Sequence, residues 1–304
     1  MNSTSGPAPT PATRARHLLP LTVWLCPDDT TSPPIPPTGQ PHQTPDRRAA
    51  LTKICDRHRA SINTTLARHI INATTGEGDV ITEAFTTNHA TLTAAAHLGR
   101  RALACVPHPP MAQHIGAQLR ATLPQEFLGR VQMRPCRADQ MHRGVADHLG
   151  RVSLVIAAPP IPRAATTHTG PRTASSPGGC PACLSDVLAN TAFQTRSFLP
   201  AAYRILRPGG HLAVVTTARH LNGRLVDPAP EIIRQARAAG FRYSQHVIAV
   251  RVPVEGDTLL VQASPVSIGQ LRDVRSRALP PAVRVHADVC LLTRPGDTSR
   301  GGNR

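Results

Sequence analysis

The chain has 304 residues, 40% of them hydrophobic, which is enough for one large domain or two small ones with a proper core. No run of about 18 apolar residues occurs, and the first residues lack a charged start followed by an apolar run. We therefore expect neither a membrane span nor a secretory signal, but a cytoplasmic protein. The formal net charge of +16 is typical of nucleic-acid binding, yet a GC-rich genome that favours Ala, Pro, Arg and Thr would raise it without any ligand. Charge alone leaves DNA binding open.

Residues 1–48 are dominated by Pro, Thr, Ser and Gly, a composition that predicts a disordered tail. One apolar island in this tail, LPLTVWLC, holds the only tryptophan, Trp24, and could pack on the domain as a strand. The next segment, residues 49–74, predicts a helix because its apolar residues recur at helical spacing. These residues are Leu51, Ile54, Ile62, Leu66 and Ile70.

From residue 79 onward, short apolar runs alternate with helical stretches. The predicted strands lie at 80–82, 102–106, 131–133, 154–158, 212–216, 244–252 and 285–293. The predicted helices end near residues 98, 122, 206 and 239. This alternation predicts an α/β fold with three α/β/α layers, doubly wound around a mainly parallel seven-stranded sheet, whose ligands bind beyond the carboxyl ends of the strands. The domain is expected to cover residues 49–295 and to be followed by a disordered tail at 296–304.

A long polar segment, residues 161–185, follows one of these strands and is expected to be a flexible loop insertion, either a lid over the ligand crevice or disordered. It contains the pair Cys180 and Cys183, which has no second pair at zinc-binding spacing, so we expect a plain loop and no metal. The seven cysteines are odd in number and irregularly spaced, which argues against a disulfide framework.

Four motifs follow one another in a telling order: LARHII before GDVITEAF, an isolated acid in CRADQ, a strand ending in a double proline in VSLVIAAPPI, and RILRPGGHLAVVT. In this order they resemble the class I S-adenosylmethionine-dependent methyltransferases. The closer resemblance is to bacterial DNA amino-methyltransferases, which modify adenine N6 or cytosine N4, and to the short DNA-methylase-like proteins of actinobacteria. The resemblance covers about residues 49–294 and implies a Rossmann-like methyltransferase fold, S-adenosylmethionine as cofactor and DNA as partner, with RNA as an alternative.

The resemblance places the cofactor loop after the first of these strands, where the family has an acidic residue and two glycines. The corresponding residues here are Glu83, Ala84, Phe85, Thr86, Thr87 and Asn88. Thr87 and His89 stand in place of the two glycines, and a β-branched residue is strained at positive φ, so the loop is expected to change shape or to stop binding. Asn88 could adopt a left-handed turn and contact the ligand.

Further positions of the family pattern are altered. The second strand ends without the acid that holds the ribose hydroxyls, because Pro107, His108 and Pro109 stand there. Asp139 corresponds to the acid near the adenine amine, or is an ordinary loop or cap residue. Upstream, His58 and Ser61 correspond to a basic or polar pair that precedes the first helix of the family.

The catalytic motif of the family reads Asp, Asn or Ser, then Pro-Pro and an aromatic residue. Here it reads Ala158, Pro159, Pro160 and Ile161. Alanine cannot accept a hydrogen bond from the target amine, and isoleucine offers no π face to a flipped base, whereas the proline carbonyls remain available. We therefore expect a methyltransferase of the DNA amino-methyltransferase type with weak or lost catalysis. The alternatives are a noncatalytic nucleic-acid-binding or scaffold protein on the same fold, and a small-molecule methyltransferase.

Overall fold

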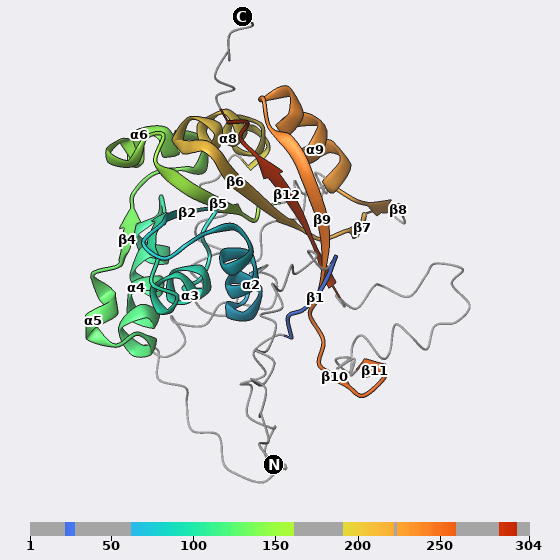
Figure 1. Ribbon diagram of the computed structural model, residues 1–304, viewed down its shortest axis with the longest axis horizontal. Coiled ribbons are helices and arrows are strands. Elements are labelled where there is room, and N and C mark those ends of the chain that lie inside the picture. The colour runs from blue at the N-terminus through green and yellow to red at the C-terminus, as the bar shows by residue number, and fades with distance from the viewer. Residues whose placement is uncertain (1–21, 28–61, 161–190, 222–223, 260–285, 297–304) are drawn as a thin grey trace, which may run out of the picture.

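The computed structural model describes residues 22–27, 62–160, 191–221, 224–259 and 286–296 (Figure 1). The predicted loop insertion and most of the two predicted tails lie outside these ranges, as does the first half of the helix predicted at 49–74. Within the described part of the chain, that helix begins at residue 64. None of the described helices is long and apolar enough to cross a membrane.

One eight-stranded sheet forms the centre of the fold, with the strand order β1-β9-β12-β6-β5-β2-β3-β4. Strand β12 is antiparallel to both of its neighbours, and every other neighbouring pair in the sheet is parallel. This order, with its single reversed strand, is that of the Rossmann-like methyltransferase fold, so the predicted fold class is confirmed, with one additional edge strand. The strands are β1 (Val23–Leu25), β2 (Val80–Ala84), β3 (Arg101–Cys105), β4 (Val131–Arg134), β5 (Val152–Ala157), β6 (Leu206–Thr216), β9 (Arg242–Val250) and β12 (His286–Thr293).

Helices cover both faces of this sheet and enclose two apolar cores (Figure 1). One face packs against α2 (Thr64–Thr74), α3 (Ala90–His97) and α4 (Pro109–Thr122), and the other against α6 (Met141–Gly144), α8 (Thr191–Ile205) and α9 (Ala229–Ala238). The central strand β5 is buried along its whole length, which explains why its sequence VSLVIA lacks the alternation of a half-exposed strand.

Several short elements were not predicted because they are too brief to show a period. They are α5 (Gln125–Leu128), the 3₁₀ turns η2 (Ala138–Gln140) and η3 (Ala146–His148), and two small hairpins. The hairpins pair β7 (Arg219–Leu221) with β8 (Arg224–Val226), and β10 (Val254–Glu255) with β11 (Thr258–Leu259).

The apolar island around Trp24 forms the edge strand β1, which pairs in parallel with β9. Trp24 is 8% exposed and stacks on His69 of α2, with ring centroids 5.6 Å apart. Asn63 then ties this strand to the same helix, because its amide donates to the carbonyls of Cys26 and Pro27 while its Oδ1 accepts from the Leu66 N–H and caps α2. The segment predicted to be a tail therefore contributes one strand to the sheet.

The RPGG stretch forms a turn within β6 and is held by the end of β12. Gly209, at a φ of 75°, donates its N–H to the Arg294 carbonyl, and the Arg294 N–H donates to the carbonyl of Gly210. A side chain at Gly210 would lie 2.9 Å from the Arg207 carbonyl, so glycine is required there by close approach. The Arg294 guanidinium also donates to the Tyr203 carbonyl and lies over the Tyr203 ring, so it caps the end of α8.

We expect the Trp24→Ala substitution to lower the free energy of unfolding by about 3 kcal/mol, because it empties the contact between β1 and α2. Val23→Ala on the same strand is the matched control. Its side chain is 45% exposed, so a change of less than about 0.5 kcal/mol is expected. Urea unfolding followed by far-UV circular dichroism measures both, and equal effects would show that β1 does not depend on Trp24.

Candidate functional site

The candidate site lies where the parallel strands β2, β3 and β5 end side by side. Glu83 of β2 is in register with Ala104 of β3 and with Ile156 of β5, and Ala84 is in register with Ala157. The loop after β2 and the double-proline segment after β5 therefore start next to each other at the same edge. The sequence predicts a mainly parallel sheet with ligands beyond the carboxyl ends of its strands, and the structure confirms that these strands are parallel and adjacent. The chemical roles of the residues stay predictions.

The loop after β2 keeps Thr87 and His89 out of the left-handed region, in which glycine is favoured. Phe85 has a φ of 60° and is the one non-glycine residue with positive φ in the described part of the chain. Thr87 and His89, at the two glycine positions of the family, thus avoid the left-handed region. A bulky residue in that region stores strain of about 1–3 kcal/mol. The Phe85 ring is held by an edge contact with Phe198 of α8, with centroids 5.1 Å apart.

The left-handed turn expected at Asn88 is not formed, and the Asn88 side chain is engaged within the fold. Its Nδ2 donates to the Ile62 carbonyl at 2.8 Å, and its Oδ1 accepts from the Ala90 N–H at 2.9 Å. The side chain thus joins the loop to the segment before α2 and caps the first turn of α3, and the backbone does not adopt the left-handed turn. Both the nitrogen and the oxygen of the amide therefore hold the loop in place through hydrogen bonds.

Glu83 lies below the loop rather than on the surface of the crevice. It is 3% exposed, and its Oε2 has no hydrogen-bond partner among the described residues. Burial raises the pKa of this carboxyl from 4.5 to about 8, although the nearby hydroxyls of Thr91 and Thr86 oppose the rise. The carboxyl is therefore mostly protonated at neutral pH and would present a neutral acid, not an anion, to a ligand.

Asp139, predicted to meet the adenine amine, is engaged by its own neighbour. Its carboxylate accepts two hydrogen bonds from Arg137, at 2.9 Å from Nε and 2.5 Å from Nη2, and the Asp139 side chain is 7% exposed. A bidentate pair of this kind is strong and geometrically specific. The Asp139 carboxylate is thus already paired within the fold, and its contact with an adenine amine stays a prediction. The end of β3 offers no acid, because Pro107, His108 and Pro109 stand there.

The double-proline segment is described from Ala158 to Pro160, and all three residues are partly exposed at the sheet edge. Ala158 packs against the core on the side of α2 and α3. Ile161, His58 and Ser61 lie outside the described residues, so the complete predicted catalytic motif is not placed. Cys180 and Cys183 also lie outside them.

Sequence reasoning missed four buried threonine hydroxyls in β2, α3 and β6. The Oγ1 atoms of Thr82, Thr91, Thr93 and Thr216 are buried and have no hydrogen-bond partner of regular geometry among the described residues. Threonine inside strands and helices reads as an ordinary β-branched filler, so no pattern marked these positions. No group of three His, Cys, Asp or Glu side chains within the described ranges could hold a metal ion.

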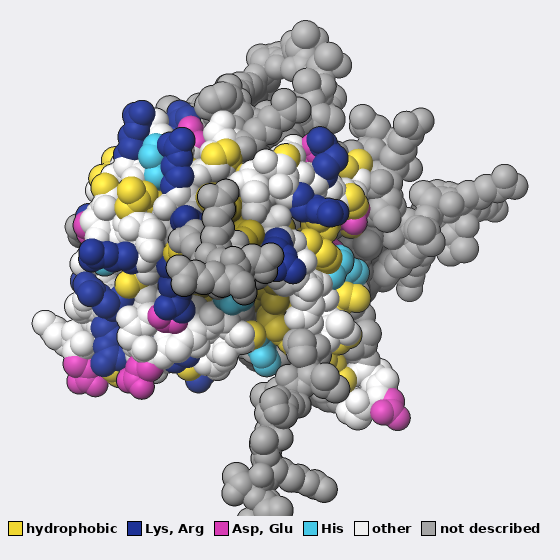
Figure 2. All heavy atoms as spheres, turned by 45° about the horizontal axis from the view of Figure 1, so that its top comes forward, with side chains coloured by type: hydrophobic (Ala, Val, Ile, Leu, Met, Phe, Trp, Pro, Cys, Tyr) yellow, Lys and Arg dark blue, Asp and Glu magenta, His cyan; other side chains and the backbone are white. Residues whose placement is uncertain are grey.

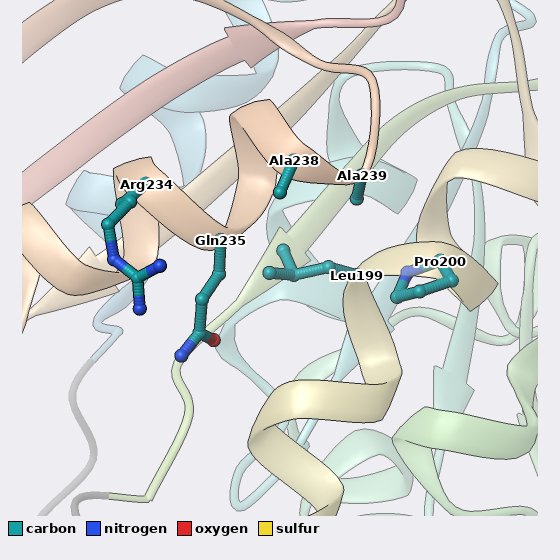
Figure 3. A pocket seen from close by; sticks show the side chains of 6 residues that line it. All are labelled: Leu199, Pro200, Arg234, Gln235, Ala238 and Ala239. Atoms are coloured by element: carbon teal, nitrogen blue, oxygen red, sulfur yellow. The ribbon is translucent and has the colours of Figure 1, made fainter.

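A separate open groove of about 470 Å³ lies between α8 and α9 (Figure 3). It is lined by Leu199, Pro200, Arg234, Gln235, Ala238 and Ala239. Arg234 pairs with Glu231 at 2.5 Å, and none of the predicted site residues lines the groove. It is therefore distinct from the edge formed by β2, β3 and β5.

Comparison with known proteins gives likeness of fold only. No family model and no curated protein matches the chain. Similar solved structures include a predicted O-methyltransferase from Agrobacterium tumefaciens, with 13% identity over 79% of this chain and 82% of that one and a TM-score of 0.44. The 1,6-didemethyltoxoflavin-N1-methyltransferase of Burkholderia thailandensis, solved with its substrate and S-adenosylhomocysteine, has 15% identity over 79% and 80% and a TM-score of 0.42. The precorrin-6y C5,15-methyltransferase of Geobacter metallireducens has 10% identity over 80% and 98% and a TM-score of 0.45.

We expect Asn88→Ala to lower the free energy of unfolding by about 1–3 kcal/mol, because it removes a helix cap and leaves the Ile62 carbonyl without its donor. Asn88→Ser keeps a side-chain oxygen that can accept from the Ala90 N–H but lacks the amide that donates to Ile62, so its loss is expected to be smaller. Urea unfolding of both variants measures the difference. A larger loss in Asn88→Ser than in Asn88→Ala would contradict the assigned cap.

The buried Glu83 gives stability a defined pH dependence. Because its folded-state pKa of about 8 exceeds the unfolded value near 4.5, the folded protein holds a proton that the unfolded chain releases. This contribution is fully present below the unfolded pKa and is lost as the pH rises through about 8, with a slope approaching about 1.4 kcal/mol per pH unit. Glu83→Gln should remove the slope, which urea unfolding across this pH range tests; an unchanged slope would assign it to other groups.

Proposed function

We propose that this chain is a methyltransferase-fold protein of the DNA amino-methyltransferase type, in which binding of the methyl donor and methyl transfer to an exocyclic base amine are weak or lost. The observation that carries the proposal is the register of Ala84 with Ala157, which places the loop after β2 beside the double proline after β5. A methyl donor and a target amine need to meet between two such segments. The changed side chains at both segments support the reduced activity.

S-adenosylmethionine is the cofactor that this proposal implies, but the described side chains fit it poorly. The carboxylate of Asp139 is held by Arg137, and the carboxyl of Glu83 is enclosed and largely neutral. The end of β3 supplies no acid for ribose hydroxyls. The loss of one buried hydrogen-bond partner weakens binding by about 1–3 kcal/mol, so several such losses bring affinity below a useful range, although the losses do not simply add.

The segment after β5, which would hold the target amine, has also lost hydrogen-bonding groups. The double proline fixes the backbone after β5, and its carbonyls can accept hydrogen bonds from an amine. Ala158 supplies no second acceptor, so a target NH₂ would be held on one side only. Methyl transfer depends on this alignment, and a loosely held amine reacts slowly.

A noncatalytic nucleic-acid-binding role is the second candidate, and the net charge of +16 favours it. Arginine side chains are spread over the face shown in Figure 2, with uncharged and hydrophobic surface between them. Such a distribution suits contacts with phosphates that do not depend on base sequence. This role predicts DNA binding that weakens steeply with salt and needs no methyl donor.

Calorimetric titration with S-adenosylmethionine tests the leading proposal. We expect no saturable binding tighter than about 1 mM, which corresponds to roughly −4 kcal/mol. The matched variant Ala158→Asn restores the missing acceptor on the target side without touching the loop after β2, so its donor binding should equal that of the unchanged chain. Micromolar binding by the unchanged chain would contradict the proposal and would establish an active, divergent enzyme.

A mobility-shift assay with duplex DNA at low and high salt, without cofactor, separates the two candidates. Retention at low salt that is lost at high salt supports the binding role. Methyl transfer from labelled S-adenosylmethionine to DNA would contradict the purely noncatalytic role, and transfer only to small molecules would contradict both.

A further inference from the structure

Two buried cysteines lie together at the edge formed by β3 and β4. Cys105 is the last residue of β3 and is fully buried, whereas Cys136 follows the end of β4 and is 8% exposed. The two thiols interact closely enough for each to shift the pKa of the other: Cys136 raises the pKa of Cys105, and Cys105 lowers the pKa of Cys136. From the sequence, the odd number and irregular spacing of the cysteines argued against a disulfide framework and did not mark this pair.

The backbone brings these cysteines together through one carbonyl group. Cys105 is in register with Arg134 of β4. The Arg134 carbonyl accepts the N–H of Val106 at 2.9 Å and the N–H of Cys136 at 2.8 Å. The chain thus turns back immediately after β4, and Cys136 lies over the end of the neighbouring strand. This turn is part of the sheet edge and does not depend on the thiols.

Helix α6 fixes the side chain of Cys136 from the other side. A Cβ atom built on Gly144 would lie 2.3 Å from the Cys136 sulfur and 2.7 Å from its Cβ. Only the absence of a side chain at Gly144 leaves room for this sulfur, which is therefore confined between α6 and Cys105.

The other described cysteines differ from this pair. Cys26 and Cys290 lie in the two apolar cores, and burial raises their pKa values to about 11 and about 12. The interaction with Cys105 and the charge of Arg134 instead lower the pKa of Cys136. Thiolate character and exposure determine which thiol reacts first, and both favour Cys136.

We propose that Cys105 and Cys136 form a dithiol site that reduces a hydroperoxide and closes to a disulfide. The sulfur of Cys136 attacks one peroxide oxygen, the O–O bond breaks, and the leaving oxygen departs as water or an alcohol. The sulfur of Cys105 then attacks the resulting Cys136 sulfenic acid, the S–O bond breaks, and water leaves. In sum, two thiols lose two hydrogens and the peroxide takes them up. This site goes beyond the proposed methyltransferase role and requires no methyl donor.

The disulfide would act on the candidate site through the chain that follows Cys136. Arg137 is the next residue and holds Asp139 in its bidentate pair. A covalent bond between Cys105 and Cys136 would fix this turn to the end of β3. Oxidation is therefore expected to change the edge of the sheet locally while leaving the fold intact.

Peptide mapping of the full chain tests the proposal directly. The protein is treated with hydrogen peroxide, blocked with N-ethylmaleimide, and digested with trypsin. We expect a linked pair of peptides, residues 102–120 and residues 131–137, lighter by two hydrogens than their sum and separated by a reducing agent. Far-UV circular dichroism recorded before digestion shows whether the oxidised protein remains folded.

Variants assign the order of the two steps. Cys136→Ser should abolish the reaction with peroxide at this site, whereas Cys105→Ser should leave a Cys136 sulfenic acid that dimedone traps. Cys290→Ala is the matched control, buried in the same core as the pair, and should form the linked peptides to the same extent as the unchanged chain. Recovery of both cysteines as blocked thiols from peroxide-treated, folded wild-type protein would overturn the proposal, as would a disulfide from either one to another cysteine.

Discussion

The parallel register of β2 between β3 and β5 is the constraint on which the rest of the structure depends. Glu83 lies opposite Ala104 on one side and Ile156 on the other, so three strands end at the same edge. Both faces of these strands are covered by helices, and a slip of one residue would move every side chain of a strand from one apolar core to the other. The loop after β2 and the double proline therefore keep their positions even though their side chains have changed.

The architecture could be predicted because each main helix and strand shows a hydrophobic pattern that extends over several residues. The order of strands and helices and the apolar island at Trp24 correspond to runs of residues that need burial, whereas the reversed direction of β12 is known only from the structure. Elements of three or four residues, such as η2, carry no period, and their conformation is decided by neighbours in space. The same applies to the start of α2, which Asn63 sets by capping the helix.

The site was less predictable, because the role of each polar side chain depends on which residue it contacts in the folded chain. Asn88 reads as a polar loop residue, and its bond to the Ile62 carbonyl exists only in the folded chain. With Thr87 and His89 in place of glycines, the loop was expected to change shape or to stop binding; its positive φ is at Phe85, where Phe198 of a distant helix holds the ring. For Asp139 the sequence contained a clue, since Arg137 is two residues away and forms the bidentate pair.

Strand β1 has a further consequence for how the protein is made. It is the first described element of the chain, yet it pairs with β9, one of the last. On the ribosome, Trp24 is therefore synthesised long before its neighbour in the sheet. Contacts between such distant segments form late because closing the intervening loop is entropically unfavourable. The sheet thus acquires its outermost strand only after β9 has been made, although α2, the other partner of Trp24, follows β1 much earlier in the chain.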